Sequence, residues 1–399
     1  MTRCRLVFFK DEEEIRAKLL SIGAEPPGIK IMVPKSAFYT ILVEGLSLKA
    51  ALILKQEMLS KGGECVLPRS VAALQDKRAN ALLCGTLRHF TRLIQRLRGQ
   101  YFGLPGLARQ LEQAIADSRP RPRSLKFKNK HINLGERTLI MGILNVTPDS
   151  FSDGGRFYDR AAAVDQALKM VEHGADIIDI GGESTRPGHE AISTEEEIGR
   201  VVPVIEAVRE AAPNVPISID TYKSAVARAA LAAGAEMLND IWGGLRDPAI
   251  LELAASHGLP ICLMHNRDHT RYRDLLSEVV ADLKDCASRA LAAGVAEEDI
   301  VLDPGIGFGK DAAQNLAVMR HLREITSLRY PILLGTSRKS TIGKVLNLPV
   351  DQRLEGTAAT VAYGIACGVE IVRVHDLPEM QRVVRMTDAI CRGGNLFAG

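Results

Sequence analysis

The hydrophobic pattern divides the chain near residue 130. Beyond this point, short apolar runs alternate with longer amphipathic stretches over about 270 residues, close to the ~250 of one (β/α)8 barrel. The runs lack the polar alternation of a half-buried strand, as expected for strands that are covered on both faces. The eight expected strands are Leu139–Leu144, Asp176–Ile180, Pro216–Ile219, Glu236–Leu238, Pro260–Met264, Asp299–Leu302, Pro331–Leu334 and Glu370–Val374. The sequence therefore predicts an α/β protein with a TIM barrel in residues 131–399.

Residues 1–117 show a different pattern, typical of a small α/β domain with a first strand at Leu6–Phe9. The amphipathic stretch Thr86–Arg98 predicts a helix with an arginine stripe, which we interpret as a solvated face rather than a nucleic-acid site. This domain carries no catalytic motif, so we expect an accessory or oligomer-forming role. Residues 118–130 are polar, basic and interrupted by prolines, which predicts a linker.

Composition adds few constraints. With 46% hydrophobic and 25% charged residues and a formal net charge of +3, the chain has the balance of an ordinary globular protein. No apolar run approaches membrane-spanning length, and the N-terminal apolar segment is too short for a signal peptide. The seven cysteines are scattered and form no CxxC pair. We therefore expect reduced thiols and a cytoplasmic protein without membrane or nucleic-acid partners.

Polar residues follow every expected barrel strand. The first of these segments, MGILNVTPDSFSDGG at 141–155, passes from a buried strand through Asn145 into a loop rich in turn residues. In a TIM barrel all C-terminal strand ends lie on one face, where active sites are built. The other strand-end candidates are Asp179, Gly181–Gly188, Asp220, Asn239–Asp240, His265–Asn266, Asp303–Lys310, Gly335–Ser340 and Arg373–Asp376.

The chemistry of these residues separates into two zones. Buried acids and amides, with one lysine, suit a polar ring that carries N–H donors and carbonyl acceptors; these residues are Asp220, Asn239, Asp303 and Lys339. Cationic side chains suit an anion with several oxygens, such as a diphosphate; these residues are Arg186, Arg338, Arg373 and His375. A diphosphate usually brings Mg2+, for which Asn145 offers a single oxygen ligand. The residues indicate a flat heteroaromatic diphosphate bound in the barrel mouth.

Eight motifs, in this order, resemble the dihydropteroate synthase family, the folate-pathway enzymes that sulfonamides inhibit. They are MGILNVTPDSFSDGG, IDIGGESTRPG, ISIDT, MLNDI, LMHNRD, LDPGIGFGK, GTSRKS and RVHD, and the match covers about residues 131–399. The resemblance implies the condensation of 7,8-dihydropterin-6-ylmethyl diphosphate with p-aminobenzoate to give 7,8-dihydropteroate and diphosphate. It also implies a homodimer, Mg2+ as cofactor and a reaction without a protein nucleophile.

The resemblance further implies roles for individual residues. The pterin would be held by Asp220, Asn239, Asp303 and Lys339, with support from Asp179. Asn145 would help to bind Mg2+, and the diphosphate would be held by Arg186, Arg373 and His375. The p-aminobenzoate site would be lined by Thr185, Pro187, Phe308 and Ser337. The residues expected to be catalytic are Asp220, Lys339, Arg373, His375 and, through closure of the first loop, Asp153.

Two other functions stay open on the sequence. A methyltetrahydrofolate-dependent methyltransferase would use a similar pterin floor but needs neither a diphosphate zone nor a metal. The basic residues after the second, seventh and eighth strands argue against it. A non-catalytic pterin-binding regulator would not need the elaborate loop that follows the first strand.

Overall fold

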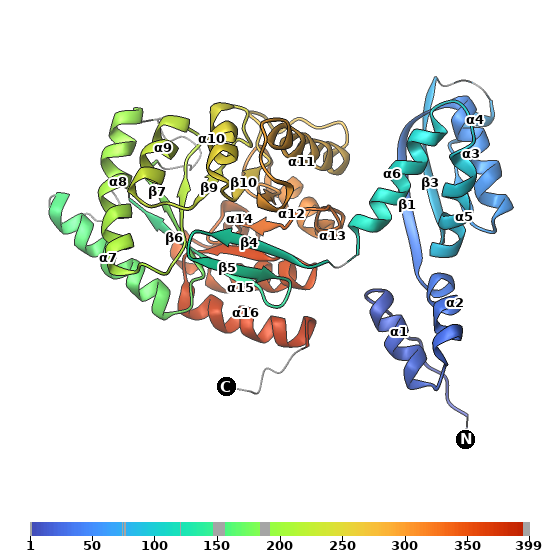
Figure 1. The fold of residues 1–399 in the computed structure, drawn as a ribbon, viewed down its shortest axis with the longest axis horizontal. Helices are drawn as coiled ribbons and strands as arrows, with labels where there is room; N and C mark the ends of the chain where they lie inside the picture. The colour runs from blue at the N-terminus through green and yellow to red at the C-terminus, as the bar shows by residue number, and fades with distance from the viewer. Residues whose placement is uncertain are drawn as a thin grey trace. The chain divides into compact units, whose positions relative to one another are not determined.

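The structure, a computed structural model, describes residues 2–73, 75, 77–119, 121–146, 156–183 and 192–393, and only the backbone of 156–159. Residue contacts divide the chain into two compact units, Met1–Pro120 and Arg121–Gly399. Each unit has its own hydrophobic core. This division agrees with the expected small domain followed by a barrel (Figure 1).

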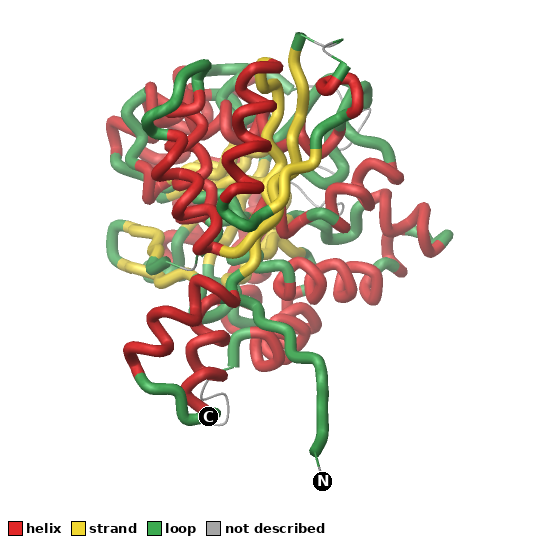
Figure 2. Tube along the Cα trace, turned by 90° about the vertical axis from the view of Figure 1, so that its right-hand side faces the viewer, coloured by secondary structure: helices red, strands yellow, loops and turns green. Residues whose placement is uncertain are grey.

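The N-terminal unit is a three-stranded antiparallel sheet with helices packed against it. Its elements are α1 (Glu12–Ser21), α2 (Pro26–Ser36), β1 (Phe38–Ser47), α3 (Leu48–Ser60), β2 (Glu64–Val66), α4 (Arg69–Ala72), β3 (Arg78–Thr86), α5 (Leu87–Leu97) and α6 (Leu104–Asp117). The predicted apolar face of α5 is confirmed, since Phe90 and Leu97 are fully buried. The strand expected at Leu6–Phe9 is wrong: this segment is an exposed loop that pairs with no described strand (Figure 2).

A β-hairpin opens the second unit inside the segment that was expected to be a linker. β4 (Arg123–Phe127) pairs with β5 (Lys130–Leu134), and apolar side chains of both strands point to one side. They form a cluster with residues at the start of the barrel strands: Leu125, Phe127, Ile132, Leu134, Leu139, Met141, Ile177, Met237, Cys262, Val301, Leu333 and Ile371. The expectation of a linker throughout 118–130 is therefore wrong. The hairpin closes the amino-terminal end of the barrel, and the surrounding prolines and basic residues obscured its strand alternation.

Eight parallel strands form the barrel, in the order β11-β10-β9-β8-β7-β6-β13-β12. The strands are β6 (Leu139–Asn145), β7 (Ile177–Gly181), β8 (Ile217–Asp220), β9 (Met237–Asp240), β10 (Ile261–Met264), β11 (Ile300–Asp303), β12 (Leu333–Leu334) and β13 (Ile371–Val374). A bridge between Leu302 of β11 and Ile332, the residue before β12, closes the sheet. The predicted (β/α)8 barrel is confirmed.

Helices cover the outside of this barrel (Figure 1). They are α7 (Arg156–Glu172), α8 (Thr194–Ala211), α9 (Ser224–Ala233), α10 (Ala249–His257), α11 (Leu275–Ala292), η2 (Glu297–Asp299), α12 (Ala312–Arg320), α13 (Leu322–Thr326), α14 (Ser340–Leu346), η3 (Val350–Gln352), α15 (Leu354–Ala366) and α16 (Leu377–Cys391). The main core lies between strands and helices and includes outward-facing strand residues such as Ile178, Ile217 and Val372. None of the described helices combines the length and apolarity needed to cross a lipid bilayer.

Candidate active site

Polar side chains gather at the C-terminal ends of the barrel strands. β8 and β11 end at Asp220 and Asp303, while Asp179, Asn239 and Arg373 lie within the last residues of β7, β9 and β13. The strand register places Asp220 opposite Asn239. Because all eight strands are parallel, these residues share one face of the barrel. The structure therefore brings together the side chains that the sequence predicted to hold a polar ring.

Arg373 joins two of the carboxylates. Its Nε donates to Asp179 Oδ2 at 2.6 Å, and its Nη2 donates to Asp220 Oδ2 at 2.6 Å. The Asn239 side-chain amide donates to the same Asp179 oxygen at 2.9 Å. Asp179 is fully buried, and Asp220 and Asn239 are buried as well. Arg373 was expected at the diphosphate, but its guanidinium lies beside the acids of the predicted ring site.

Two oxygens of this network, Asp179 Oδ1 and Asp220 Oδ1, have no hydrogen-bond partner among the described residues. Buried polar atoms in folded proteins are nearly always paired, so such atoms call for an explanation. Burial raises the pKa of Asp220 to about 7, against the lowering effect of Arg373 and with a further increase from Asp179. Asp220 lines a pocket, so its oxygen can accept a hydrogen bond from an N–H group of a bound ring, whereas Asp179 is fully buried and does not line that pocket.

Lys339 and Phe308 contact each other in the same pocket, with Lys339 Nζ 4.0 Å from the centroid of the Phe308 ring. Burial and the nearby Arg373 lower the pKa of Lys339 to about 8. Burial also raises the pKa of Asp303 to about 6, although its Oδ1 accepts a hydrogen bond from Gly305 N at 2.7 Å. Acids and a base whose pKa values have moved towards neutrality are typical of functional sites.

The pocket is lined by Asp220, Asn239, Ile241, Met264, Asp303, Ile306, Phe308, Gly335, Lys339 and Arg373. Ile241, Met264 and Ile306 were not predicted as site residues. Each of these apolar residues lies inside or beside a strand-end motif. Their position next to polar strand ends was the sequence signal that could have indicated a place in the pocket wall. Apolar walls combined with a few convergent polar groups suit a flat ring that hydrogen-bonds along its edge.

His375 and Ser337 pair at the ends of β13 and β12. His375 Nδ1 lies 3.0 Å from Ser337 Oγ. Burial, and then the charges of Arg373 and Arg338, lower the pKa of His375 to about 3. The expectation of a cationic His375 is therefore wrong, because its imidazole is neutral at pH 7. Arg338, which was expected to be cationic, is paired with an acid, since its Nε donates to Asp376 Oδ2 at 3.0 Å.

The remaining predicted residues divide between the described and the undescribed parts of the chain. Asn145 ends β6 and is half-buried. Asp153, Thr185, Arg186 and Pro187 lie outside the described residues.

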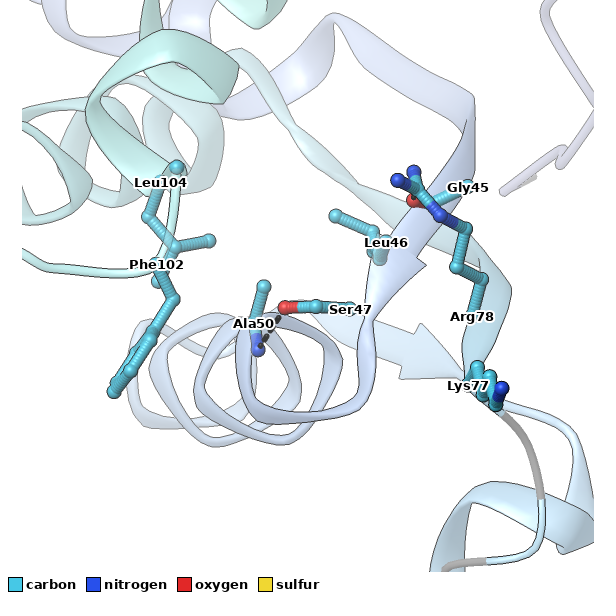
Figure 3. Close-up of a pocket in the computed structure, with 9 residues that line it drawn as sticks. Gly45, Leu46, Ser47, Ala50, Lys77, Arg78, Phe102 and Leu104 are labelled. Atoms are coloured by element: carbon cyan, nitrogen blue, oxygen red, sulfur yellow. Dashed lines mark hydrogen bonds between the residues drawn. The ribbon is translucent and has the colours of Figure 1, made fainter.

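A second hollow lies in the N-terminal unit (Figure 3). It is lined by Gly45, Leu46, Ser47, Ala50, Lys77, Arg78, Phe102, Gly103 and Leu104. Ser47 Oγ accepts a hydrogen bond from Ala50 N at 3.3 Å and caps α3, while Arg78 Nη1 donates to the Gly45 carbonyl at 2.9 Å. These described side chains thus serve the local fold, and the lining contains no acid that could pair with the serine for catalysis. The barrel pocket is the better candidate for chemistry.

Comparison with known proteins points to the same pocket. Residues 141–375 match the family model described as pterin binding enzyme. The dihydropteroate synthase of Clostridium beijerinckii is 56% identical over 271 residues, which cover 67% of this chain and 100% of that protein. A probable bifunctional folylpolyglutamate synthase/dihydropteroate synthase of Halobacterium salinarum is 39% identical over 391 residues, 96% of this chain and 46% of that protein. This second similarity extends into the N-terminal unit.

Solved structures give the same result. The dihydropteroate synthase of Clostridium difficile, crystallised in the presence of pteroic acid, superposes with a TM-score of 0.64 at 53% identity, over 65% of this chain and 98% of that chain. The Xanthomonas albilineans enzyme with 4-aminobenzoic acid superposes with a TM-score of 0.65 at 40% identity, over 68% of this chain and 98% of that chain. The chain therefore belongs to the dihydropteroate synthase family of pterin-binding enzymes.

Proposed function

We propose that the barrel pocket performs the transferase reaction of this family, joining 7,8-dihydropterin-6-ylmethyl diphosphate to p-aminobenzoate. The observation that carries the proposal is the network of Asp179, Asp220, Asn239 and Arg373. The unpaired oxygen of Asp220, which lines the pocket, can accept an N–H donor from a pterin, and leaving it unpaired is unfavourable. A Thermus thermophilus dihydropteroate synthase, 40% identical with a TM-score of 0.59, has been crystallised in complex with 6HMPPP.

In this proposal the pterin edge is held by the carboxylates and the lysine. Asp220 and Asn239 contact the amino-substituted side of the ring, Asp303 accepts a further N–H, and Lys339 donates to a ring acceptor. The Met264 and Ile306 side chains, which line the same pocket, cover the ring faces. A ring lacking these donors would leave buried acceptors unpaired, which explains how the pocket selects a pterin.

The bond changes follow a dissociative order. The C–O bond between the pterin methylene and the diphosphate breaks, and the electron pair leaves with the diphosphate. Arg186 binds the leaving group by charge, Arg373 adds positive charge from its place beside Asp179 and Asp220, and the neutral His375 contributes an N–H donor. The methylene cation is stabilised by the ring and by nearby carboxylates. The p-aminobenzoate nitrogen then forms the C–N bond and releases one proton to solvent, so no protein nucleophile is required.

Mg2+ is proposed as the cofactor. Among the described residues, no group of three or more His, Cys, Asp or Glu side chains could hold a metal ion. Asn145, half-buried at the end of β6, offers one amide oxygen, and diphosphate oxygens and water would complete the coordination. Mg2+ is usually bound by few protein ligands, and phosphate oxygens and water complete its coordination. When bound, the ion neutralises charge on the leaving diphosphate.

The p-aminobenzoate half of the site is assigned to Phe308 and Ser337, together with Thr185 and Pro187 of the loop after β7. Asp153, in the loop after β6, is assigned to closure over the substrates, which excludes water from the cation. The Yersinia pestis dihydropteroate synthase, 41% identical with a TM-score of 0.63, has been crystallised in a sulfonamide drug complex. We propose that sulfonamides bind this chain in the same half of the site.

We also propose an oligomeric state and a cellular location for the chain. The neighbouring helices α15 and α16 expose Tyr363, Met386 and Ile390, which suits burial in a homodimer. All seven cysteines are free thiols, which is consistent with the reducing cytoplasm. The N-terminal unit is assigned an accessory role. Sedimentation of the full chain tests the dimer.

The reaction is tested by diphosphate release from dihydropterin diphosphate, with and without p-aminobenzoate, in Mg2+ and in EDTA. We expect release that requires Mg2+, rises with p-aminobenzoate and yields dihydropteroate. Asp220→Ala should abolish turnover through loss of pterin binding, while the exposed Asp285→Ala should behave like the parent chain. Tight pterin binding without release under any condition would contradict the proposal.

A further inference from the structure

A buried lysine holds the turn that forms one wall of the barrel pocket. Lys310 lies at the end of the turn between β11 and α12 and is 7% exposed. Its Nζ donates to the main-chain oxygens of Gly305 and Phe308, each at 3.0 Å. The same nitrogen lies 2.8 Å from His265 Nδ1. An ammonium has three protons, so these three acceptors use all of them.

The histidine anchors this lysine to the neighbouring strand. His265 follows β10, and its side chain is fully buried. Burial lowers its pKa, so the imidazole is neutral at pH 7. His265 Nε2 lies 3.2 Å from Asp282 Oδ2, and a proton on that nitrogen leaves Nδ1 free to accept from Lys310. Asp282 also accepts from Arg267 Nε at 2.7 Å, so the lysine is fixed from outside its own turn.

The turn that Lys310 holds contributes two side chains to the pocket. Ile306 and Phe308 both line it, and the Phe308 ring lies against Lys339 Nζ. The two carbonyls bound by Lys310 belong to residues 305 and 308, so its hydrogen bonds bracket Ile306 and include Phe308. One nitrogen thus sets the shape of this part of the pocket wall.

Lys310 does not line the pocket itself. Its described hydrogen bonds go to two main-chain oxygens and to His265, none of which is a side chain of the pocket. Its charge also lowers the pKa of Asp303, although burial of that acid has the larger, opposite effect. The lysine can therefore act on a bound ring through the shape of the turn or through charge, and a test has to separate the two.

We infer that Lys310 is a positioning residue for the pterin ring, because it fixes the turn that presents Ile306 and Phe308 to the pocket. The inference rests on the proposed function, which makes a pterin the ring that this pocket takes. A binding site keeps its contacts only if its walls are held to within about 0.5 Å. Loss of these hydrogen bonds should therefore weaken ring binding even in a chain that folds.

The test measures the Kd of 6-hydroxymethyl-7,8-dihydropterin, which has the ring but no diphosphate, by calorimetry without p-aminobenzoate. Burial lowers the pKa of Lys310 to about 7, so the titrations are made below this pH, where the lysine carries all three protons. We expect Lys310→Met to raise the Kd about tenfold, the equivalent of roughly one hydrogen bond. Lys284→Met, an exposed change on α11, should leave the Kd unchanged.

A second control addresses stability. Val208→Ala removes a fully buried side chain from α8, in the core between helices and strands. It should lower the urea midpoint of unfolding, because it leaves a cavity, but it should not change the Kd of the ring. Loss of ring affinity in Lys310→Met then reflects the pocket wall and not the stability of the barrel.

A double-mutant cycle tests whether Lys310 acts through the turn. Phe308→Ala removes part of the pocket wall and the ring that Lys339 contacts, so it should also raise the Kd about tenfold. If the lysine acts by placing Phe308, the double variant should bind about as weakly as the weaker single variant. Independent effects would multiply to roughly 100-fold.

Tyr272→Phe separates the shape of the turn from the charge of the lysine. The Tyr272 hydroxyl donates to the Gly309 carbonyl at 2.7 Å, a second tie to the same turn that carries no charge. Its removal should raise the Kd about threefold and should likewise be non-additive with Phe308→Ala. Amide hydrogen exchange at 305–308 should become faster in both Tyr272→Phe and Lys310→Met. If Lys310→Met does not fold, the Tyr272→Phe cycle carries the test.

Three results would overturn the inference while normal dihydropteroate formation by the parent chain upholds the proposed function. They are an unchanged Kd in folded Lys310→Met and Tyr272→Phe, additive effects with Phe308→Ala, and an equal rise of the Kd in Val208→Ala. Failure of the parent chain to bind the ring would instead overturn the proposed function, and the inference with it.

Discussion

The buried acid Asp220 makes the stability of the barrel depend on pH in a predictable direction. Burial raises its pKa from the ordinary 3.8 to about 7 in the folded chain. Between these values the folded chain holds a proton that the unfolded chain has released. Stability therefore falls as pH rises through this range, by about 1.4 kcal/mol for each pH unit. From about pH 5 to about pH 7 the contribution of this single group amounts to roughly 2 to 3 kcal/mol.

Asp220→Asn removes that titration and keeps the shape of the side chain. Relative to the parent chain, the variant should gain roughly 2 kcal/mol of unfolding free energy between about pH 5 and about pH 7. Comparing the two pH values cancels any pH-independent cost of the substitution itself. The other acids with raised pKa values, Asp240 and Asp303, are present in both proteins and largely cancel as well.

The assay is urea unfolding followed by tryptophan fluorescence at several pH values. The chain has a single tryptophan, Trp242, which lies just after β9, so the signal reports on the barrel. The control is Asp285→Asn, which changes an exposed acid on α11 and should give a pH dependence like that of the parent chain. A constant difference between Asp220→Asn and the parent chain across this pH range would refute the reasoning.

Three further predictions address the pocket and its backbone. Lys339→Met should lower kcat/KM by about 100-fold, whereas Lys344→Met, an exposed change on α14, should leave it unaltered; steady-state kinetics measures both. Asn145→Ala should raise the Mg2+ concentration for half-maximal diphosphate release about tenfold, and an unchanged Mg2+ titration would remove Asn145 as a ligand. Gly305→Ala should destabilise the barrel by roughly 3 kcal/mol, because φ is +66° and a Cβ would overlap the His265 carbonyl oxygen; urea unfolding measures this.

The barrel itself was predictable because each of its strands is buried on both faces. Continuous apolar runs such as Leu139–Leu144 follow directly from that burial. Three predicted strand ends, Met264, Leu334 and Val374, agree with the structure. The other five were placed one or two residues short; Asp220 and Asp303, for example, remain in the hydrogen-bonded ladder although they are polar. Hydrophobicity locates the buried part of a strand, while the ladder continues as far as backbone partners exist.

Other features depend on contacts that sequence spacing does not reveal. Arg373 pairs with Asp179 across 194 positions, so its place beside the ring acids required the closed barrel. The neutral His375 depends on burial and on two nearby arginines, which a residue type alone cannot indicate. The β4–β5 hairpin is a different case. The alternation of Leu125 and Phe127 with polar residues was visible, but the prolines before it favoured a linker.

The electrostatic balance of the pocket agrees with the proposed order of bond breaking. Three carboxylates, Asp179, Asp220 and Asp303, interact with three basic side chains, Arg373, Lys339 and Lys310. Burial raises the pKa of Asp220 and lowers that of Lys339, so ionising these two groups in the folded chain is unfavourable. An ionised Asp220 becomes favourable once positive charge develops on the pterin methylene, because fixed charges act strongly in a site without water. The buried acid that weakens the fold at neutral pH is thus one that a dissociative reaction can use.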